Sequence, residues 1–300
     1  MERILLTGSN EVLTQHFMAL YSGLYDMRLL TRHPKAENHF YWNPLHDELD
    51  PKALEGVDHI LHLAGSSASP LALDLHQRNL LWSYRAGGTA LIGRMLLAQG
   101  LEVKTFITGS STTFYGNHAD PYIHTEASAP GDDFLAQLHE AGEEEAYLLE
   151  VEALAKRSVT VRFGNILCHY GGVLPHFALG SDKGIALIFG KGEQVIPWVH
   201  ISDAARTLSW IIRHSDMYDT YNCVAPEWVT YQKLVTTVAY MRSGRTFPIH
   251  LPKVCLRTIR EELAEQYLHS NRVSSLQLIK SGFTFRYPTI QQALTSIYDL

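Results

Sequence analysis

The chain has 300 residues, 46% of them hydrophobic, which is enough for one large domain or two closely joined ones. Its 25 basic and 31 acidic side chains leave a net charge of −6 that is spread along the sequence. This balance gives no basic patch for nucleic acid or for an anionic membrane surface, so we expect neither as a partner.

The N-terminus and the cysteines point to an intracellular protein. The apolar run that follows Met1 has only the length of a strand, which is too short for a signal peptide or a membrane-spanning helix. Cys168, Cys223 and Cys255 are far apart and form no pair with metal or redox spacing. We expect reduced thiols in a cytoplasmic protein. The 16 histidines are scattered, and we predict no metal site.

The first dozen residues predict the start of a dinucleotide-binding fold. An apolar run over Ile4–Leu6 ends in Thr7-Gly8 and gives way to a helical pattern near Asn10. In such folds a glycine turn joins a buried strand to a helix, and the helix N-terminus holds a pyrophosphate. The cofactor contacts that we expect from this turn and the helix after it are Gly8, Ser9, Asn10 and Leu13.

The phosphate-binding fingerprint is incomplete, however. The spacing G-x-x-G-x-x-G requires glycines three and six residues after Gly8, where this chain has Glu11 and Thr14. A carboxylate at Glu11 is placed to repel a pyrophosphate. The turn therefore predicts the fold and leaves open whether a dinucleotide binds.

Apolar runs and helical patterns alternate through the first two thirds of the chain. The expected strands are Met27–Thr31, His39–Trp42, His59–Leu63, Thr105–Thr108 and Val159–Arg162. Helix-length segments between them are Leu75–Gln99 and Asp133–Ala155. This alternation predicts an α/β fold with a doubly wound parallel sheet of the Rossmann type, whose chemistry lies at the carboxyl ends of the strands.

The pattern changes after about Asn165, where glycines separate shorter pieces. We expect residues 1–166 to form a dinucleotide-binding Rossmann domain. Residues 167–300 are expected to form a smaller, interleaved C-terminal portion on the substrate side. Part of the chain near residues 195–225 is expected to return to the Rossmann sheet.

Two strand ends carry further candidate cofactor contacts. The second strand is followed by Arg32, which can pair with the 2′-phosphate of NADP, and no acidic residue stands there to accept the ribose hydroxyls of NAD. A solvated surface arginine is the alternative. Leu63, Ala64 and Gly65 end a later strand, and the glycine lets the backbone lie against a flat ligand.

With Thr7-Gly8, Leu63–Gly65 and the hydroxyl-rich Ser110–Gly116 in this order, the chain resembles the extended short-chain dehydrogenase/reductase superfamily. Later segments resemble its atypical, YfcH-like branch of nucleoside-diphosphate-sugar epimerase-like proteins. They are Thr125-Glu126, Pro130–Ala136, Val161–Asn165, Gly171–Leu174, Trp198–Asp203, Tyr221–Pro226 and Ser281–Pro288. The likeness covers essentially the whole chain.

The resemblance also implies which catalytic groups remain. Superfamily enzymes use a Tyr-x-x-x-Lys pair in which the tyrosine shuttles a proton, and here the two positions match Phe134 and Leu138. Ser111 matches the serine that hydrogen-bonds the substrate oxygen, and we predict it as a catalytic residue. Tyr115 is a second candidate, either as a substitute acid or as a side chain that packs against the following loop.

On the substrate side, Asn165 matches an asparagine that contacts nucleotide-sugar phosphates. Ile196 stands in place of an arginine that clamps those phosphates in relatives, so Trp198 and His200 are expected to line an apolar pocket instead. Ser202-Asp203 is expected to cap a helix over residues 204–212. Gly142 departs from the branch, which usually has tryptophan there.

Together these residues favour an NAD(P)-binding, epimerase- or reductase-like oxidoreductase acting on an unknown small molecule, with a nucleotide sugar as one candidate. NADP is the expected cofactor, NAD is less favoured, and absence of any cofactor stays open. The alternative is a catalytically silent relative with a degenerate cofactor site that binds or regulates a partner. The resemblance also implies a homodimer formed through the long helices.

Overall fold

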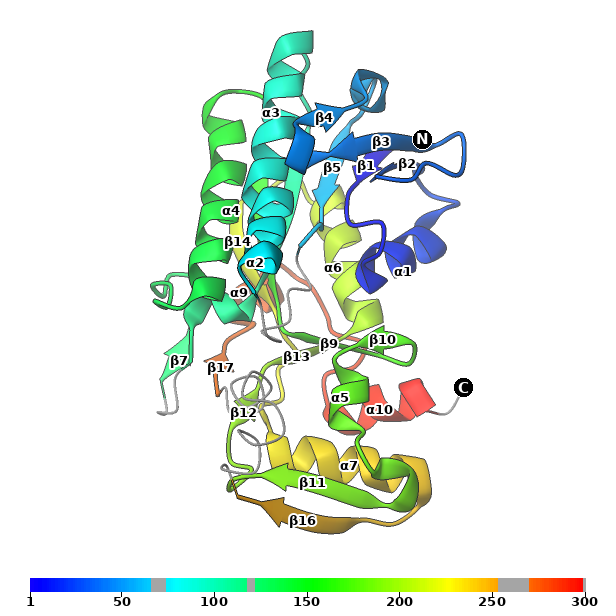
Figure 1. Cartoon of the computed structure of the whole chain (residues 1–300), viewed down its shortest axis with the longest axis vertical. Helices are drawn as coiled ribbons and strands as arrows, with labels where there is room; N and C mark the ends of the chain where they lie inside the picture. The colour runs from blue at the N-terminus through cyan, green and yellow to red at the C-terminus, as the bar shows by residue number, and fades with distance from the viewer. Residues whose placement is uncertain (66–73, 118–121, 253–269, 299–300) are drawn as a thin grey trace.

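The computed structural model in Figure 1 describes residues 1–65, 74–117, 122–252 and 270–298. Within these ranges no helix combines the length and the apolar character needed to cross a membrane. Cys255 lies outside the described residues, as do Ser66 and Ser67 after the predicted strand end at Gly65.

An eight-stranded sheet forms the centre of the molecule, in the order β14-β8-β6-β5-β1-β2-β3-β4. Its strands are β1 (Arg3–Leu6), β2 (Asp26–Thr31), β3 (His39–Asn43), β4 (Glu48–Leu49), β5 (His59–His62), β6 (Thr105–Ser111), β8 (Ser158–Phe163) and β14 (Asp219–Cys223). Every neighbouring pair is parallel except β3 with β4. The predicted doubly wound α/β fold is confirmed, and β1 and β5 lie at the point where the strand order reverses.

Alternate side chains of the strands serve two separate cores. Ile4 and Leu6 pack on the side of α1 (Val12–Tyr21) and α6 (Ile201–Arg213). Leu5 packs on the opposite side, under α3 (Gly88–Gln99) and α4 (Phe134–Val151). This period-two exchange is what a strand buried on both faces requires. Figure 1 shows the helices on the two sides of the sheet.

The helical segment predicted over Leu75–Gln99 is continuous but not uniform. It consists of α2 (Leu75–Trp82), a π-helical turn over Ser83–Gly87 and α3 (Gly88–Gln99). Beside α3 lies α4 (Phe134–Val151), which is capped at its start by the Asp133 side chain accepting from the Ala136 backbone N–H.

The lower part of the molecule in Figure 1 is built from small sheets and short helices. The strands there are β7 (Ile123–His124), β9 (Asn165–Cys168), β10 (Gly171–Gly172), β11 (Ile185–Phe189), β12 (Val195–Ile196), β13 (Trp198–His200), β15 (Val229–Thr230), β16 (Phe247–Leu251) and β17 (Arg272–Val273). The helices there are α5 (Leu174–Phe177), α7 (Tyr231–Ser243) and α10 (Ile290–Tyr298), whereas α9 (Leu276–Lys280) lies beside β14 of the main sheet. Short 3-10 turns cover Pro44–His46, Pro51–Leu54, Thr112–Tyr115 and Ser181–Lys183.

The chain crosses between the two parts more than once. After β13, the helix α6 packs on α1 and β14 joins the main sheet beside β8. The segment that holds Leu278, Phe283 and Phe285 also packs in the core under α6. The C-terminal portion therefore contributes two stretches to the Rossmann core, at about residues 201–223 and 276–285.

Candidate functional site

Thr7 ties the ends of β1 and β5 together where the site begins. Its Oγ1 accepts the backbone N–H groups of Leu63 and Ala64, each at 3.0 Å, and lies 3.0 Å from His62 Nδ1. Since Oγ1 already accepts two hydrogen bonds, its own proton is donated to Nδ1. The other ring nitrogen of His62 then donates to the Arg85 carbonyl at 3.1 Å. This network fixes the two strand ends against one another.

The glycine turn is built as the sequence predicts. Gly8 has a φ of +76°, and a Cβ there would lie 3.0 Å from the Leu63 carbonyl carbon, so only glycine fits. Thr14 takes the place of a third fingerprint glycine without opening the turn, because its hydroxyl donates to the Thr7 carbonyl at 3.1 Å. Glu11 is the N-cap residue of α1 and makes no side-chain cap bond there.

A groove of about 250 Å³ opens above this turn. It is lined by Gly8, Ser9, Asn10, Glu11, Arg32, Trp42, Ala64, Gly65, Leu80, Leu81 and Tyr84. Six of the eight predicted cofactor contacts are among them. Leu13 and Leu63 are not, because Leu13 packs into the core below α1 and Leu63 is fully buried behind Thr7. The groove lies where the strand order reverses, the usual ligand site of an open α/β sheet.

The far end of the groove combines a cation with aromatic rings. The guanidinium carbon of Arg32 lies 5.8 Å from the ring centroid of Tyr84, and Trp42 meets that ring edge-on at 5.7 Å. The Tyr84 hydroxyl is buried and has no hydrogen-bond partner within residues 1–65, 74–117, 122–252 and 270–298, and burial raises its pKa. A cation, an orphaned hydroxyl and two ring faces are groups that suit a phosphorylated nucleoside. Trp42 and Tyr84 are not among the contacts predicted from the sequence, because an aromatic residue in a strand or helix is most often part of the core.

Ser111 lies at the carboxyl end of β6 and is half-buried. Its Oγ accepts from the Thr113 backbone N–H at 3.2 Å and from the Thr113 hydroxyl at 3.0 Å. The Ser111 proton thus stays available for a ligand oxygen. Of the two positions matched to the Tyr/Lys pair, Phe134 begins α4 and Leu138 is fully buried. Neither supplies a proton, because both side chains are hydrocarbons.

Tyr115 occupies a structural network. Its hydroxyl donates to Asn222 Oδ1 at 2.7 Å and accepts from Arg162 Nη1 at 2.9 Å, and its ring stacks on His124 at 4.8 Å. Burial raises the pKa of Tyr115 to about 12, which disfavours a phenolate. This environment favours the packing interpretation over that of a substitute acid.

The predicted substrate-side residues are not part of the groove. The Asn165 amide donates to the Pro197 carbonyl at 2.8 Å, and the buried Trp198 donates from Nε1 to the Glu227 carbonyl at 3.1 Å. His200 is the N-cap of α6, accepting from the Ser202 backbone N–H at 3.1 Å. Burial lowers the pKa of His200 to about 4.

The prediction that Ser202-Asp203 caps this helix is therefore wrong by two residues, because the His200 ring takes the cap position. Asp203 is fully buried and accepts the backbone N–H groups of Arg286 and Tyr287, each at 2.9 Å. Its carboxylate therefore ties α6 to the C-terminal segment.

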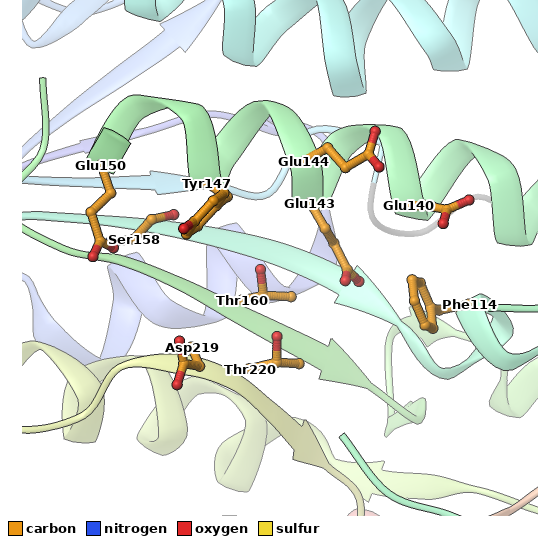
Figure 2. A pocket seen from close by; sticks show the side chains of 10 residues that line it. All are labelled: Phe114, Glu140, Glu143, Glu144, Tyr147, Glu150, Ser158, Thr160, Asp219 and Thr220. Atoms are coloured by element: carbon orange, nitrogen blue, oxygen red, sulfur yellow. The ribbon is translucent and has the colours of Figure 1, made fainter. Parts of the chain in front are cut away.

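A second cavity, of about 310 Å³, lies between α4 and the strands β8 and β14, of which β14 is the edge of the sheet (Figure 2). Its lining is Phe114, Glu140, Glu143, Glu144, Tyr147, Glu150, Ser158, Thr160, Asp219 and Thr220. Five of these ten residues are acidic, so the cavity does not suit an anionic dinucleotide. No group of three metal-ligating side chains was found in the part of the chain that the structure describes.

Comparisons with known proteins find sequence matches over most of the chain. The model of the NAD dependent epimerase/dehydratase family matches residues 4–223, and a domain of unknown function (DUF1731) matches residues 251–297. An epimerase family protein of Mycobacterium leprae is 29% identical over 271 residues, which cover 90% of this chain and 86% of the relative.

Two solved structures share the fold over nearly the whole chain. The human epimerase family protein SDR39U1, crystallised with NADPH, has a TM-score of 0.84 at 22% identity and covers 99% of both chains. A nucleoside-diphosphate sugar epimerase from Corynebacterium glutamicum has a TM-score of 0.79 at 26% identity, and the match covers 99% of this chain and 58% of the Corynebacterium chain. Because the family model spans most of the sequence, the chain belongs to the NAD dependent epimerase/dehydratase family and is an atypical member of the short-chain dehydrogenase/reductase superfamily.

Proposed function

We propose that this protein is an NADP(H)-binding, epimerase- or reductase-like oxidoreductase that acts on a small molecule. The groove at the strand-order reversal carries the proposal, since it gathers the glycine turn, Arg32 and Gly65 in one cavity. The NADPH in the human relative's crystal structure supports the choice of cofactor. The family and the three cysteines without paired spacing favour a cytoplasmic enzyme.

Different residues of the groove would bind different parts of the dinucleotide. The turn at Gly8 and the N-terminus of α1 would hold the pyrophosphate. Arg32 would pair with the 2′-phosphate, with Tyr84 as its platform. Bound NADPH would supply a hydride, and Ser111 would donate a hydrogen bond to the substrate oxygen. The substrate stays open, with a nucleotide sugar as one candidate.

A catalytically silent relative is the second candidate function. Three observations favour it: Glu11 faces the groove, Phe134 and Leu138 replace the proton-transfer pair, and Tyr115 is locked in a network. Such a protein would bind a cofactor weakly or not at all and would act through a partner. Cofactor-dependent turnover that Ser111→Ala removes would contradict it.

The Arg32→Ala variant tests the cofactor assignment. We expect its affinity for NADPH to fall at least tenfold and its affinity for NADH to change less than twofold, because only NADPH carries the 2′-phosphate. Lys35→Ala is the matched control, since Lys35 is an exposed cation close by that does not line the groove. Fluorescence titration gives all the dissociation constants. Equal losses for the two cofactors would contradict the assignment.

A further inference from the structure

Arg85 is a buried charge that the described part of the chain leaves unpaired. Its side chain is fully excluded from solvent, and none of its three guanidinium nitrogens has a hydrogen-bond partner among the described residues. Among the residues that the structure describes, no other lysine, arginine, aspartate or glutamate combines burial with orphaned polar atoms. By contrast, the buried Arg157 donates to a hydroxyl and several backbone carbonyls.

The fold makes room for this side chain between the groove and α4. Arg85 comes from the π-helical turn, whose Tyr84 lines the groove. A Cβ on Gly65 in the groove wall would lie 3.6 Å from the Arg85 Cβ. On the other side, a Cβ on Gly142 would lie 2.8 Å from the Arg85 Cγ, so the arginine stem fills the space that Gly142 leaves open. The base of the Arg85 side chain therefore lies behind the groove wall, and its outer part lies against Gly142 of α4.

The charge of Arg85 is not balanced by a contact. Burial lowers its pKa to about 10, while the more distant carboxylates of Glu143 and Glu11 act in the opposite direction, so the side chain is a cation at pH 7. Glu143 is already engaged by Arg162 at 2.7 Å. A buried cation without a partner is strongly unfavourable, and an anion that binds beside it would offset that cost.

We propose that Arg85 is a buried oxyanion-binding residue of the groove, and that it takes a phosphate oxygen of the bound dinucleotide. This inference rests on the proposed function. It also explains how the groove could hold a pyrophosphate although Glu11 lines it, because an added cation would offset the repulsion by that carboxylate. Because the guanidinium makes no hydrogen bond in the present arrangement, none is broken when it turns toward the ligand. π-helical turns occur frequently at functional sites.

The test compares wild type with Arg85→Met and Arg85→Lys, using Arg213→Met on the opposite side of the sheet as the control. Calorimetry gives the dissociation constant for NADPH. Thermal unfolding with sodium pyrophosphate, against sodium chloride at equal ionic strength, reports anion binding alone. We expect Arg85→Met to bind NADPH at least tenfold more weakly and Arg85→Lys to lie between it and wild type. Without ligand, Arg85→Met should melt no lower than wild type, because the removed charge is unpaired.

The outcomes separate this inference from the proposed function. If wild type binds NADPH and Arg85→Met binds it equally well, the role of Arg85 is overturned and the cofactor assignment stands. If wild type does not bind NADPH but pyrophosphate stabilises wild type and not Arg85→Met, the oxyanion site stands and the cofactor is wrong. If Arg85→Met does not fold, Arg85→Lys decides: at least threefold weaker binding supports the inference, and unchanged binding overturns it.

Discussion

Among single residues, His62 is a buried histidine whose protonation state affects both the stability of the fold and the hydrogen bonds beside the groove. Its neutral ring bridges the Thr7 hydroxyl and the Arg85 carbonyl, and burial lowers its pKa to about 4. An unfolded histidine titrates near pH 6.5, so between pH 6.5 and 4 the unfolded state binds the extra proton. His62 therefore destabilises the fold as the pH falls through this window, by about 3 kcal/mol in all.

We expect wild type to lose more stability than His62→Gln between pH 7 and pH 4.5. Urea unfolding of both proteins across this range measures the difference. The other buried histidines, such as His139 and His200, also have lowered pKa values but are common to both proteins, so the comparison isolates His62. Parallel stability curves would contradict the account.

Tyr115 gives a prediction on stability without an effect on binding. Its hydroxyl is the shared partner of Asn222 and Arg162, two buried polar groups. Tyr115→Phe leaves both short of a partner and should lower the free energy of unfolding by about 1–3 kcal/mol. Affinity for NADPH should stay within twofold of wild type. A normal unfolding free energy with lost cofactor binding would instead make Tyr115 a site residue.

At the scale of elements, the contact between the π-helical turn and α4 depends on Gly142. Its substitution to alanine places a Cβ 2.8 Å from the Arg85 Cγ and 2.9 Å from its Nε, so the two helices or the arginine must move. We expect Gly142→Ala to destabilise the fold by about 1–3 kcal/mol. Gly23→Ala is the control, because nothing lies within 4 Å of that Cβ. Chemical denaturation of both variants checks this, and equal midpoints would contradict it.

The strands could be predicted from the sequence because a parallel sheet buried on both faces leaves uninterrupted apolar runs, such as Ile4–Leu6 and Thr105–Thr108. The glycine turn and Arg32 could be placed for the same reason, since each follows a strand end. The sequence pattern could not show the π-helical turn over Ser83–Gly87, because such a turn uses the same residue types as the α-helices on either side of it. Tyr84 and Arg85 were therefore not recognised as neighbours of the groove.

The cap of α6 shows why local rules fail where distant segments meet. Ser and Asp are common N-cap residues, so Ser202-Asp203 was the natural prediction. Here the Asp203 carboxylate is occupied by backbone groups 83 and 84 residues further along the chain. The His200 ring caps the helix in its place. Only the tertiary structure carries that information.

At the scale of the whole molecule, the exposed sides of α3 and α4 suggest how two copies meet. Leu97 on α3 is 66% exposed, and on α4 both Tyr147 and Val151 are 61% exposed. The two helices lie side by side (Figure 1). We propose that the protein is a homodimer through this face, because apolar helix surfaces of this kind mark contact sites.

Val151→Glu should convert the dimer into a monomer, since it buries a charge in the proposed contact. Light scattering coupled to size exclusion reads the mass directly. Leu20→Glu is the control, because Leu20 is 50% exposed on α1, on the other side of the sheet. A wild-type monomer, or a dimer that Val151→Glu leaves intact, would contradict this arrangement.

We propose that the groove above Gly8 holds NADPH in spite of Glu11. Calorimetric titration of the wild-type protein with NADPH, beside the Glu11→Gly variant, is the decisive measurement. We predict saturable binding of one NADPH per chain to wild type, with a tighter complex in Glu11→Gly because a carboxylate no longer faces the pyrophosphate. Wild type without any binding, and binding restored in Glu11→Gly, would contradict it and would show that Glu11 closes the site.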